Sequence, residues 1–382
     1  MGFLNRSVSF SRFKTSKKVS YGTENLRERI KKNAFREVEE NSEEEISIGW
    51  VALNDWIDNK FEETSSFLKA SFISLSLRVD KRKVPKQAIY TQYRKRLAER
   101  YTEEEQRLTK EDRENIKEAV TARLLRRAIP TTQIYDMIWN THTNEVFFTS
   151  TSEKLCLTFF EIFNKTFDCT LIQIFPYSMA EEHVSSLALK QLSSTNFVHG
   201  TFSNVEHSDN RAELPIIKRF LGQEFLTWLW YMSDTCENER LAIYRKKEAE
   251  SIEAFIGDKI TLETLTEEDN EKIMCHGQTS EMLEAFKAIS QGKKITSMDF
   301  NIIIEDRDYV VTLDDKWLNF KTCKTPKISL NKEDMDGAFF EKIYLINELT
   351  AIVNNLFETF IKERVSGLWA TRIRSIVLWL NK

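Results

Sequence analysis

The chain has 382 residues, of which 41% are hydrophobic and 30% charged, which is enough for two or three domains with apolar cores. Its 10 glycines and 5 prolines exclude collagen-like and linker-dominated architectures, and its 26 phenylalanines and 8 tryptophans exclude a wholly disordered chain. The net charge is only −4, but residues 1–130 carry +7 and residues 131–382 carry −11. A polyanionic partner would be attracted locally to the basic part.

The cysteines and the N-terminal residues indicate the cellular compartment in which the protein is expected. Five cysteines without close pairs argue against a disulfide framework and favour reducing conditions. There is no uncharged apolar run of about 18 residues, so no membrane-spanning helix is expected. The segment Met1 to Arg6 lacks both the apolar run of a secretory signal and the Ser or Thr of a myristoylation motif. A cytoplasmic protein is therefore expected.

The first 80 residues predict the order strand, helix, strand, strand. Residues 6–14 form the first strand, Thr23 precedes the helix, and residues 46–53 form the second strand. The acidic run 39–45 is expected to be a solvated loop. The apolar face of the helix is formed by Leu26, Ile30 and Phe35. The third strand alternates with polar residues and is predicted to be half-buried, with an apolar side formed by Ile73, Leu75, Leu77 and Val79.

Residues 86–127 predict a charged helical hairpin that protrudes as an arm. Pro85 suits the first turn of a helix, and Pro130 ends the second helix. Capping-box patterns begin at Thr102 and at Thr109. The apolar stripes are narrow and consist of Ile89, Tyr93 and Leu97 in the first helix, and of Ile116, Val120 and Leu124 in the second.

Beyond the arm, strand and helix patterns alternate. Residues 133–150 predict a hairpin, Ser152 begins a helix, and residues 171–175 form a strand. Residues 178–215 are polar and rich in turns. Later segments predict a buried aromatic helix at 220–231, a three-stranded meander at 295–323, a long amphipathic helix at 339–365 and an apolar helical face at 368–380.

These patterns predict an α+β fold of small antiparallel sheets, each covered by helices, with the protruding charged hairpin and a long C-terminal helix. Four parts are expected. Residues 1–85 with 128–178 form a central α/β domain, residues 86–127 the arm, residues 179–330 a second α+β domain with an inserted polar and aromatic region, and residues 331–382 a C-terminal helical segment.

The usual catalytic and metal-binding motifs are missing from the sequence. There is no Gly-rich phosphate loop, no Cys-x-x-Cys and no recognisable nucleophile motif. Cys275-His276 is an isolated pair, whereas a metal site needs three or four ligands. Glu305, Asp306 and Asp308 could supply carboxylates to a metal-dependent nuclease, although a solvated hairpin turn is favoured. No catalytic residue, cofactor or metal is therefore expected.

The strongest functional signal is the concentration of basic residues in and beside the arm. A charged helix is usually only a solvated face, but here like charges are neighbours, which favours binding of a phosphate backbone. Few aromatic residues lie among them, which favours duplex over single-strand contact. The candidate DNA-binding residues are Lys81, Arg82, Lys83, Lys86, Arg94, Lys95, Arg96, Arg123, Arg126 and Arg127.

Several short motifs follow one another in a distinctive order. They are Ile48-Gly49-Trp50-Val51, Lys83-Val84-Pro85, Leu124-Leu125-Arg126-Arg127-Ala128-Ile129, a hairpin with Trp139, and the helix after Ser152. In this order the first 180 residues resemble the RdgC family of recombination-associated proteins, whose motifs are Met-Gly-Trp-Val, a basic-aliphatic-Pro step and Leu-Leu-Pro-Arg-Ala-Phe. The second half is similar more weakly, through residues 225–229, the meander and the long helix.

The resemblance implies a ring-shaped homodimer with a positively charged hole. Such proteins bind double-stranded DNA with little sequence preference and restrain RecA-promoted strand exchange, without a cofactor. Arg127 matches a family position directly, and the other candidates follow from local charge. Arg126 replaces the family's Pro, which adds charge and permits further helix. Ile129 replaces the family's Phe near the subunit contact and is the expected dimer-contact residue.

Three hypotheses follow from the sequence. The first is a non-enzymatic, nucleoid-associated duplex-DNA-binding homodimer that modulates RecA-type recombination. The second is an oligomeric scaffold whose arm and last helix contact only proteins. The third is a metal-dependent DNA-processing enzyme that uses the carboxylates around Asp306.

Overall fold

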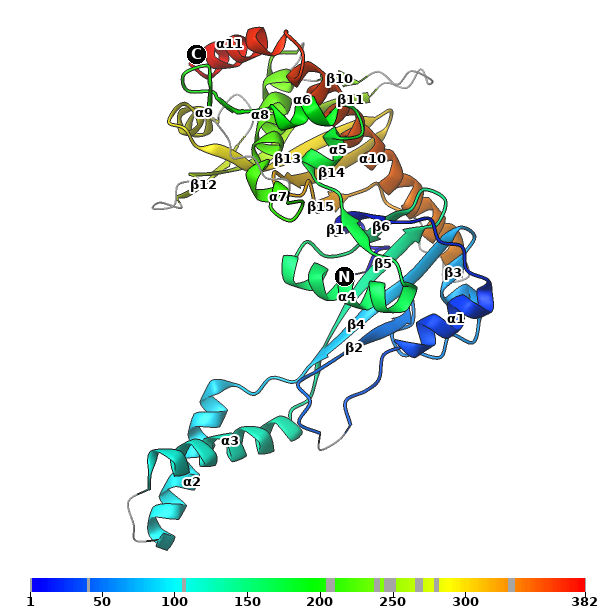
Figure 1. The fold of residues 1–382 in the computed structure, drawn as a ribbon, viewed down its shortest axis with the longest axis vertical. Helices are drawn as coiled ribbons and strands as arrows, with labels where there is room; N and C mark the ends of the chain where they lie inside the picture. Colours follow the sequence, from blue (N-terminus) through cyan, green and yellow to red (C-terminus); the bar gives the residue numbers. More distant parts are fainter. Residues whose placement is uncertain are drawn as a thin grey trace. The chain divides into compact units, whose positions relative to one another are not determined.

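The protein is α+β, with 42% of the residues in helices and 28% in strands of a computed structural model (Figure 1). The structure describes residues 2–39, 42–104, 108–203, 210–236, 241–243, 252–264, 271–277, 282–328 and 334–381. It divides into two compact units. The C-terminal unit comprises Met1–Ser16, Glu145–Cys156 and Leu171–Lys382, and the arm unit comprises Lys17–Asn144 and Leu157–Thr170. These ranges differ from the four parts expected from the sequence, since the first strand belongs with the C-terminal residues.

The C-terminal unit is built on an antiparallel sheet with the strand order β10-β11-β13-β14-β15-β1-β6. The N-terminal strand β1 pairs with β15 on one side and with β6 on the other. The strands of this unit are β1 (Ser7–Thr15), β6 (Glu145–Phe148), β7 (Leu171–Gln173), β8 (Ser194–Asn196), β9 (Thr201–Ser203), β10 (Leu241–Ile243), β11 (Ile252–Glu263), β12 (Lys272–His276), β13 (Lys294–Ile304), β14 (Arg307–Asp314) and β15 (Phe320–Lys324).

Helices cover this sheet and each other through aromatic contacts. Phe225 packs on Phe360 with ring centroids 5.5 Å apart, and Trp230 packs on Trp379 at 5.1 Å. The buried aromatic helix, the long helix and the last helix are thus confirmed. The helices of this unit are α5 (Pro176–Ala180), α6 (Ser186–Lys190), α7 (Leu214–Ile217), α8 (Phe220–Asp234), α9 (Leu283–Ser290), α10 (Met335–Arg364) and α11 (Trp369–Leu380).

The arm unit contains a second antiparallel group of strands in the order β5-β4-β2, with β3 paired to β4. Trp139 packs on Phe163 at 5.2 Å, and Trp50 packs on Phe159 at 6.3 Å, so α4 covers one face of these strands. The elements are α1 (Thr23–Lys32), β2 (Ile46–Ala52), η1 (Thr64–Ser66), β3 (Leu68–Lys69), β4 (Phe72–Lys81), α2 (Lys86–Glu104), α3 (Lys110–Arg126), β5 (Thr131–Asn140) and the part of α4 (Glu153–Phe167) from Leu157 onward.

The arm, defined as α2 and α3 (residues 86–126), is inserted between two paired strands. The register of β4 and β5 places Lys81 opposite Thr131, so the two roots of the arm are neighbours. The two helices lie side by side (Figure 1). Arg123 Nη2 donates a hydrogen bond to Gln92 Oε1 at 3.3 Å. The expected helical hairpin is therefore confirmed, and α3 continues through Arg126, where the resembling family has Pro.

Two local predictions in the arm unit are wrong. The first helix ends at Lys32, and Phe35 instead pairs with the edge of β2, its N–H donating to Trp50 O at 2.9 Å. Strand β4 is not half-buried, because Ser74 and Ser76 are fully buried as well as its apolar side. Ser76 Oγ donates to Asp136 at 2.7 Å, which satisfies its hydroxyl on that covered face.

Other elements depart from the sequence pattern. Helix α2 includes Thr102, so the first capping-box pattern does not begin a helix, and its Glu105 lies outside the described residues. The second pattern is confirmed at Thr109. Strands β11 and β12 were not expected at all. The turn-rich region 178–215 contains short helices and the β8–β9 hairpin, and residues 204–209 of it lie outside the described part.

Candidate nucleic-acid interface

The start of each arm helix is fixed by local hydrogen bonds. Pro85 O accepts the N–H of Ala88 at 2.9 Å, which begins α2 directly after the extended root. At the start of α3, Thr109 N donates to Asp112 Oδ2 at 2.9 Å, and Asp112 N donates to Thr109 Oγ1 at 3.1 Å. These bonds to Thr109 lower the pKa of Asp112 below its usual value. The reciprocal cap defines where the second helix begins.

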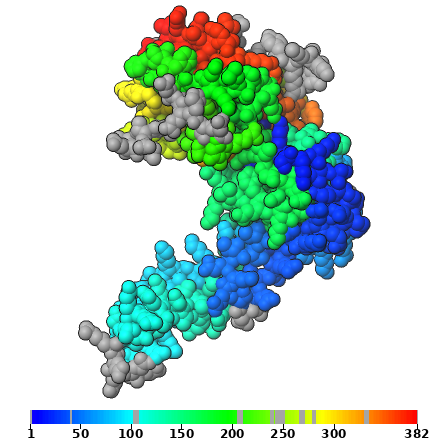
Figure 2. Space-filling model, in the orientation of Figure 1, coloured from blue at the N-terminus to red at the C-terminus, as the bar shows by residue number. Residues whose placement is uncertain are grey.

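Most of the candidate DNA-binding side chains lie on the surface of the arm and its roots. Between Lys81 and Arg100 the only acidic residue is Glu99. Most described side chains of the arm are exposed, and Figure 2 shows part of the arm's surface in cyan. Within the described residues, six candidates are exposed and form no ion pair or side-chain hydrogen bond, namely Lys81, Lys83, Lys86, Arg94, Lys95 and Arg127.

Three further candidates are exposed but have partners. Arg96 Nη1 lies 2.9 Å from Glu99 Oε2 one helical turn away, and Arg126 forms an ion pair with Glu43. Arg123 contacts Gln92, as described above. Exposed pairs of this kind contribute only about 0.2–1 kcal/mol, because water and salt screen them. A polyanion could therefore compete for these arginines at small cost.

Arg82 has a different environment from its neighbours. Its side chain is buried, and Nη1 donates to Ser42 O at 3.0 Å, while Nη2 donates to the carbonyls of Val38 and Glu39 at 3.4 and 3.3 Å. Its backbone N–H also donates to Glu45 O at 2.8 Å. Arg82 thus holds the acidic segment before β2 against the root of the arm, and its guanidinium is turned away from solvent.

The motif Ile48-Gly49-Trp50-Val51 is part of the core of the arm unit. A Cβ at Gly49 would lie 2.3 Å from Phe35 Cα, so only glycine fits beside that segment. Trp50 is fully buried, and its indole donates to Thr166 Oγ1 at 2.8 Å. This motif therefore maintains the fold. Ile129, in contrast, follows the arm and is 88% exposed.

The alternative metal ligands from the sequence lie in the turn between β13 and β14 and at the start of β14. Glu305 has a φ of 53° and, with Asp306, connects β13 to β14. Glu305, Asp306 and Asp308 are all exposed. Cys275 is buried in β12, whereas the neighbouring His276 is exposed. Across the part of the chain that the structure describes, no three His, Cys, Asp or Glu side chains form a group that could hold a metal ion.

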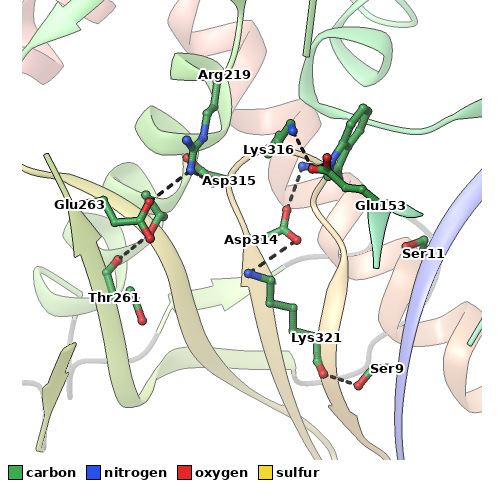
Figure 3. A network of polar contacts seen from close by, with 12 residues as sticks. Ser9, Ser11, Glu153, Arg219, Thr261, Glu263, Asp314, Asp315, Lys316 and Lys321 are labelled. Atoms are coloured by element: carbon green, nitrogen blue, oxygen red, sulfur yellow. Dashed lines mark hydrogen bonds and ion pairs between the residues drawn. The ribbon is translucent and has the colours of Figure 1, made fainter. Parts of the chain in front are cut away.

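A second set of carboxylates lies inside the C-terminal unit (Figure 3). Asp315 is 2% exposed and accepts hydrogen bonds from Arg219 Nε at 2.7 Å and from Gln223 Nε2 at 2.9 Å. Arg219 also lies 3.8 Å from Glu263. Burial raises the pKa of Asp315 to about 6, against the lowering effect of Arg219. This pair ties α8 to the end of β14.

The neighbouring carboxylates of the same network are also partnered. Asp314 accepts the N–H of Trp317 at 2.8 Å and lies 4.0 Å from Lys321 Nζ. Glu153 accepts a hydrogen bond from Lys316 Nζ at 2.6 Å. Burial raises the pKa of Asp314 as well. Figure 3 shows these side chains directed at their basic and backbone donors, so the network stabilises the turn between β14 and β15.

The sequence of residues 6–195, about half of the chain, matches the family model described as "RdgC: Putative exonuclease, RdgC". The chain belongs to the RdgC family. The match includes both arm helices and ends at β8. No curated protein matches the chain in a sequence comparison. Among the described helices, none is long and apolar enough to cross a membrane.

Proposed function

We propose that the protein is a non-enzymatic, nucleoid-associated protein of the cytoplasm that binds double-stranded DNA without sequence specificity. The observation that supports this function is the group of exposed, unpaired basic side chains on the arm and its roots, including Lys81, Lys83, Arg94 and Lys95. Cations arranged along a narrow surface bind phosphates and release counterions, which favours duplex DNA at physiological salt. The network of Asp314 and Asp315 offers no comparable surface for an anion.

The first experiment measures binding of random-sequence duplex DNA by fluorescence anisotropy across a salt series. The wild-type protein is expected to show a linear fall of log K with log salt. The double variant Arg94→Gln/Lys95→Gln should weaken binding roughly tenfold or more at about 0.1 M salt and reduce the slope by about two, equally for all sequences.

The arm provides a matched control for this double variant. Lys110→Gln/Lys117→Gln removes the same charge from α3, but these lysines lie among Glu111, Glu114 and Glu118. Its affinity should stay within about twofold of wild type, because the neighbouring glutamates already offset the positive charge of these lysines. No duplex binding by the wild type at low salt would reject the proposed function, and the oligomeric scaffold would replace it.

We further propose that the active form is a ring-like homodimer that restrains RecA-type recombination. Ile129 supports this proposal, because it stands where the resemblance to the RdgC family places the subunit contact, and its side chain is 88% exposed and so accessible to another subunit. Sedimentation of wild type and of Ile129→Glu tests it. A dimer that dissociates in the variant is expected, whereas a wild-type monomer would contradict the assembly without affecting the DNA-binding test.

The family description names an exonuclease, and this activity has its own test. Linear duplex DNA is incubated with the protein and Mg²⁺ or Mn²⁺, and products are separated on a gel. Intact DNA is the expected result. Degradation that Asp306→Ala abolishes would instead establish the enzyme and assign the turn between β13 and β14 to its site.

A further inference from the structure

The arm contains a groove between its two helices, separate from the exposed lysines at its roots. The groove has a volume of about 520 Å³. Three arginines line it, namely Arg96 and Arg100 from α2 and Arg123 from α3. They come from both helices, so the groove exists only where α2 and α3 pack together. Its volume falls within the usual range of about 300–1,000 Å³ for small-molecule sites.

The floor of the groove is apolar. Leu108 and Val120 line it and are 8% and 4% exposed, and Ile116 lies beside them one turn earlier on α3. Ala119 is an exposed lining residue. Basic side chains alone bind phosphate, so aliphatic side chains beside the three arginines are not needed for that purpose. The apolar floor indicates a ligand with a flat apolar part as well as a negative charge.

Two polar side chains complete the lining. Asp112 is held by its cap with Thr109, so its carboxylate is committed to the start of α3. Arg96 also pairs with Glu99, in an exposed ion pair that a phosphate can replace at small cost. Asn115 also lines the groove and offers both a donor and an acceptor. Amide groups of this kind pair with the edges of nucleobases, and guanidinium groups both bind phosphate and stack on bases.

We propose that this groove holds one unpaired nucleotide of a DNA strand, with its phosphodiester at the three arginines and its base on the apolar floor. This inference rests on the proposed function, because it takes DNA as the partner. A base within a duplex is stacked and must be extruded at a cost of a few kcal/mol before it can enter. The protein is therefore expected to prefer duplex DNA that carries a single-stranded tail over blunt duplex of equal length.

The test compares tailed and blunt duplexes by anisotropy with the full chain. Wild type should bind a duplex with a short thymidine tail roughly five- to tenfold more tightly than the blunt one, which corresponds to about 1–1.4 kcal/mol for contact of one base with the groove. Ala119→Trp fills the groove while leaving every charge in place, and it should abolish this preference without changing blunt-duplex affinity. Ala98→Trp, on an exposed α2 position outside the groove, is the matched control and should keep the preference.

The possible outcomes separate this inference from the proposed function. Failure of wild type to bind either duplex would reject the proposed function. Equal binding of both duplexes by wild type, or a preference that persists in Ala119→Trp, would overturn the groove's role alone. Binding of a polyglutamate peptide by wild type but not by Ala119→Trp, without any tail preference, would assign the groove to a protein partner and also overturn it.

Discussion

The arm and the interior of the C-terminal unit both carry arginines, but they place them in opposite environments. In the C-terminal unit, Arg364 is 4% exposed and paired with Glu224, and Arg219 is paired with Asp315. On the arm and at its root, Arg94 and Arg127 are exposed and have no such partner among the described residues. The first kind of arginine connects elements of the fold. The second kind keeps its charge available to another molecule.

The two kinds of arginine are expected to affect different properties, namely the stability of the fold and the affinity for DNA. Removing one partner of a buried ion pair leaves an uncompensated buried charge and strongly destabilises the fold. Exposed basic residues contribute little to stability, so their loss is expected to appear in DNA affinity instead. Substitutions in the two regions should therefore affect different measurements, and the following predictions test that separation from the largest expected effect to the smallest.

The largest effect is expected at Glu224, which is 1% exposed. It accepts the N–H of Thr195 at 2.6 Å and pairs with Arg364, whose guanidinium also lies 5.1 Å from the Trp369 ring. Glu224→Ala leaves this arginine buried without its carboxylate and should lower the free energy of unfolding by about 3–5 kcal/mol. Urea denaturation measures the change. Duplex affinity at a temperature where both proteins are folded should stay the same.

The control lies on α10, the long helix that carries Arg364, the partner of Glu224. Lys362 pairs with Glu358 on the surface of α10, and Lys362→Ala should cost no more than about 0.5 kcal/mol. If Lys362→Ala and Glu224→Ala were equally destabilising, burial would not distinguish the two kinds of ion pair. A loss of duplex affinity in folded Glu224→Ala would likewise contradict the division between the regions.

The next effect is a pH dependence of stability at Asp315. Burial raises its folded-state pKa to about 6, above the usual value of 3.8, so the folded protein holds this proton more tightly than the unfolded chain does. Its contribution to stability is therefore fully present below pH 3.8 and is lost as the pH rises from about 3.8 to about 6.

Asp315→Asn removes this titration and keeps the size of the side chain. The difference in unfolding free energy, wild type minus variant, should fall as the pH rises from about 4 to about 7. Urea denaturation at several pH values measures it. A difference that rises with pH would mean that the ion pair with Arg219 outweighs desolvation and holds the folded-state pKa below its ordinary value.

The sequence predicted much of the fold but less of the surface. Apolar periodicity located α8, α10 and the hairpin of β13 and β14, because each element buries its own pattern. It could not predict that Arg82 is buried, because the carbonyl groups that accept its hydrogen bonds lie about 40 residues earlier and approach it only in the folded unit. It also could not reveal that Ser74 and Ser76 are buried, since that depends on how a distant segment covers β4.

The candidate site, like the fold, could be predicted from the sequence only in part. The density of lysine and arginine predicted the basic arm, because charge is visible in composition alone. The groove was not predicted, since Leu108 and Val120 become its floor only when α2 and α3 pack against each other. Likewise, Gly49 belongs to a recognisable motif, but the sequence does not show why glycine is needed there. The structure does, because a Cβ at this position would lie 2.3 Å from Phe35 Cα.

The smallest effect is expected for Arg126→Gln/Arg127→Gln at the end of α3. Both side chains are exposed, but Arg126 already pairs with Glu43, so a phosphate must replace that partner. The variant should weaken binding to all duplex sequences alike and reduce the salt slope by one to about two, and no more than Arg94→Gln/Lys95→Gln does. Unfolding free energy should change by less than about 0.5 kcal/mol.

The triple variant Glu43→Gln/Arg126→Gln/Arg127→Gln provides the comparison, because it also removes the competing carboxylate. Its affinity should lie at or slightly above that of the double variant, since one repulsive charge is gone from the surface. If Arg126→Gln/Arg127→Gln lost stability but kept its salt slope, the end of α3 would resemble the buried arginines of the C-terminal unit. The binding surface would then be confined to α2 and the roots of the arm.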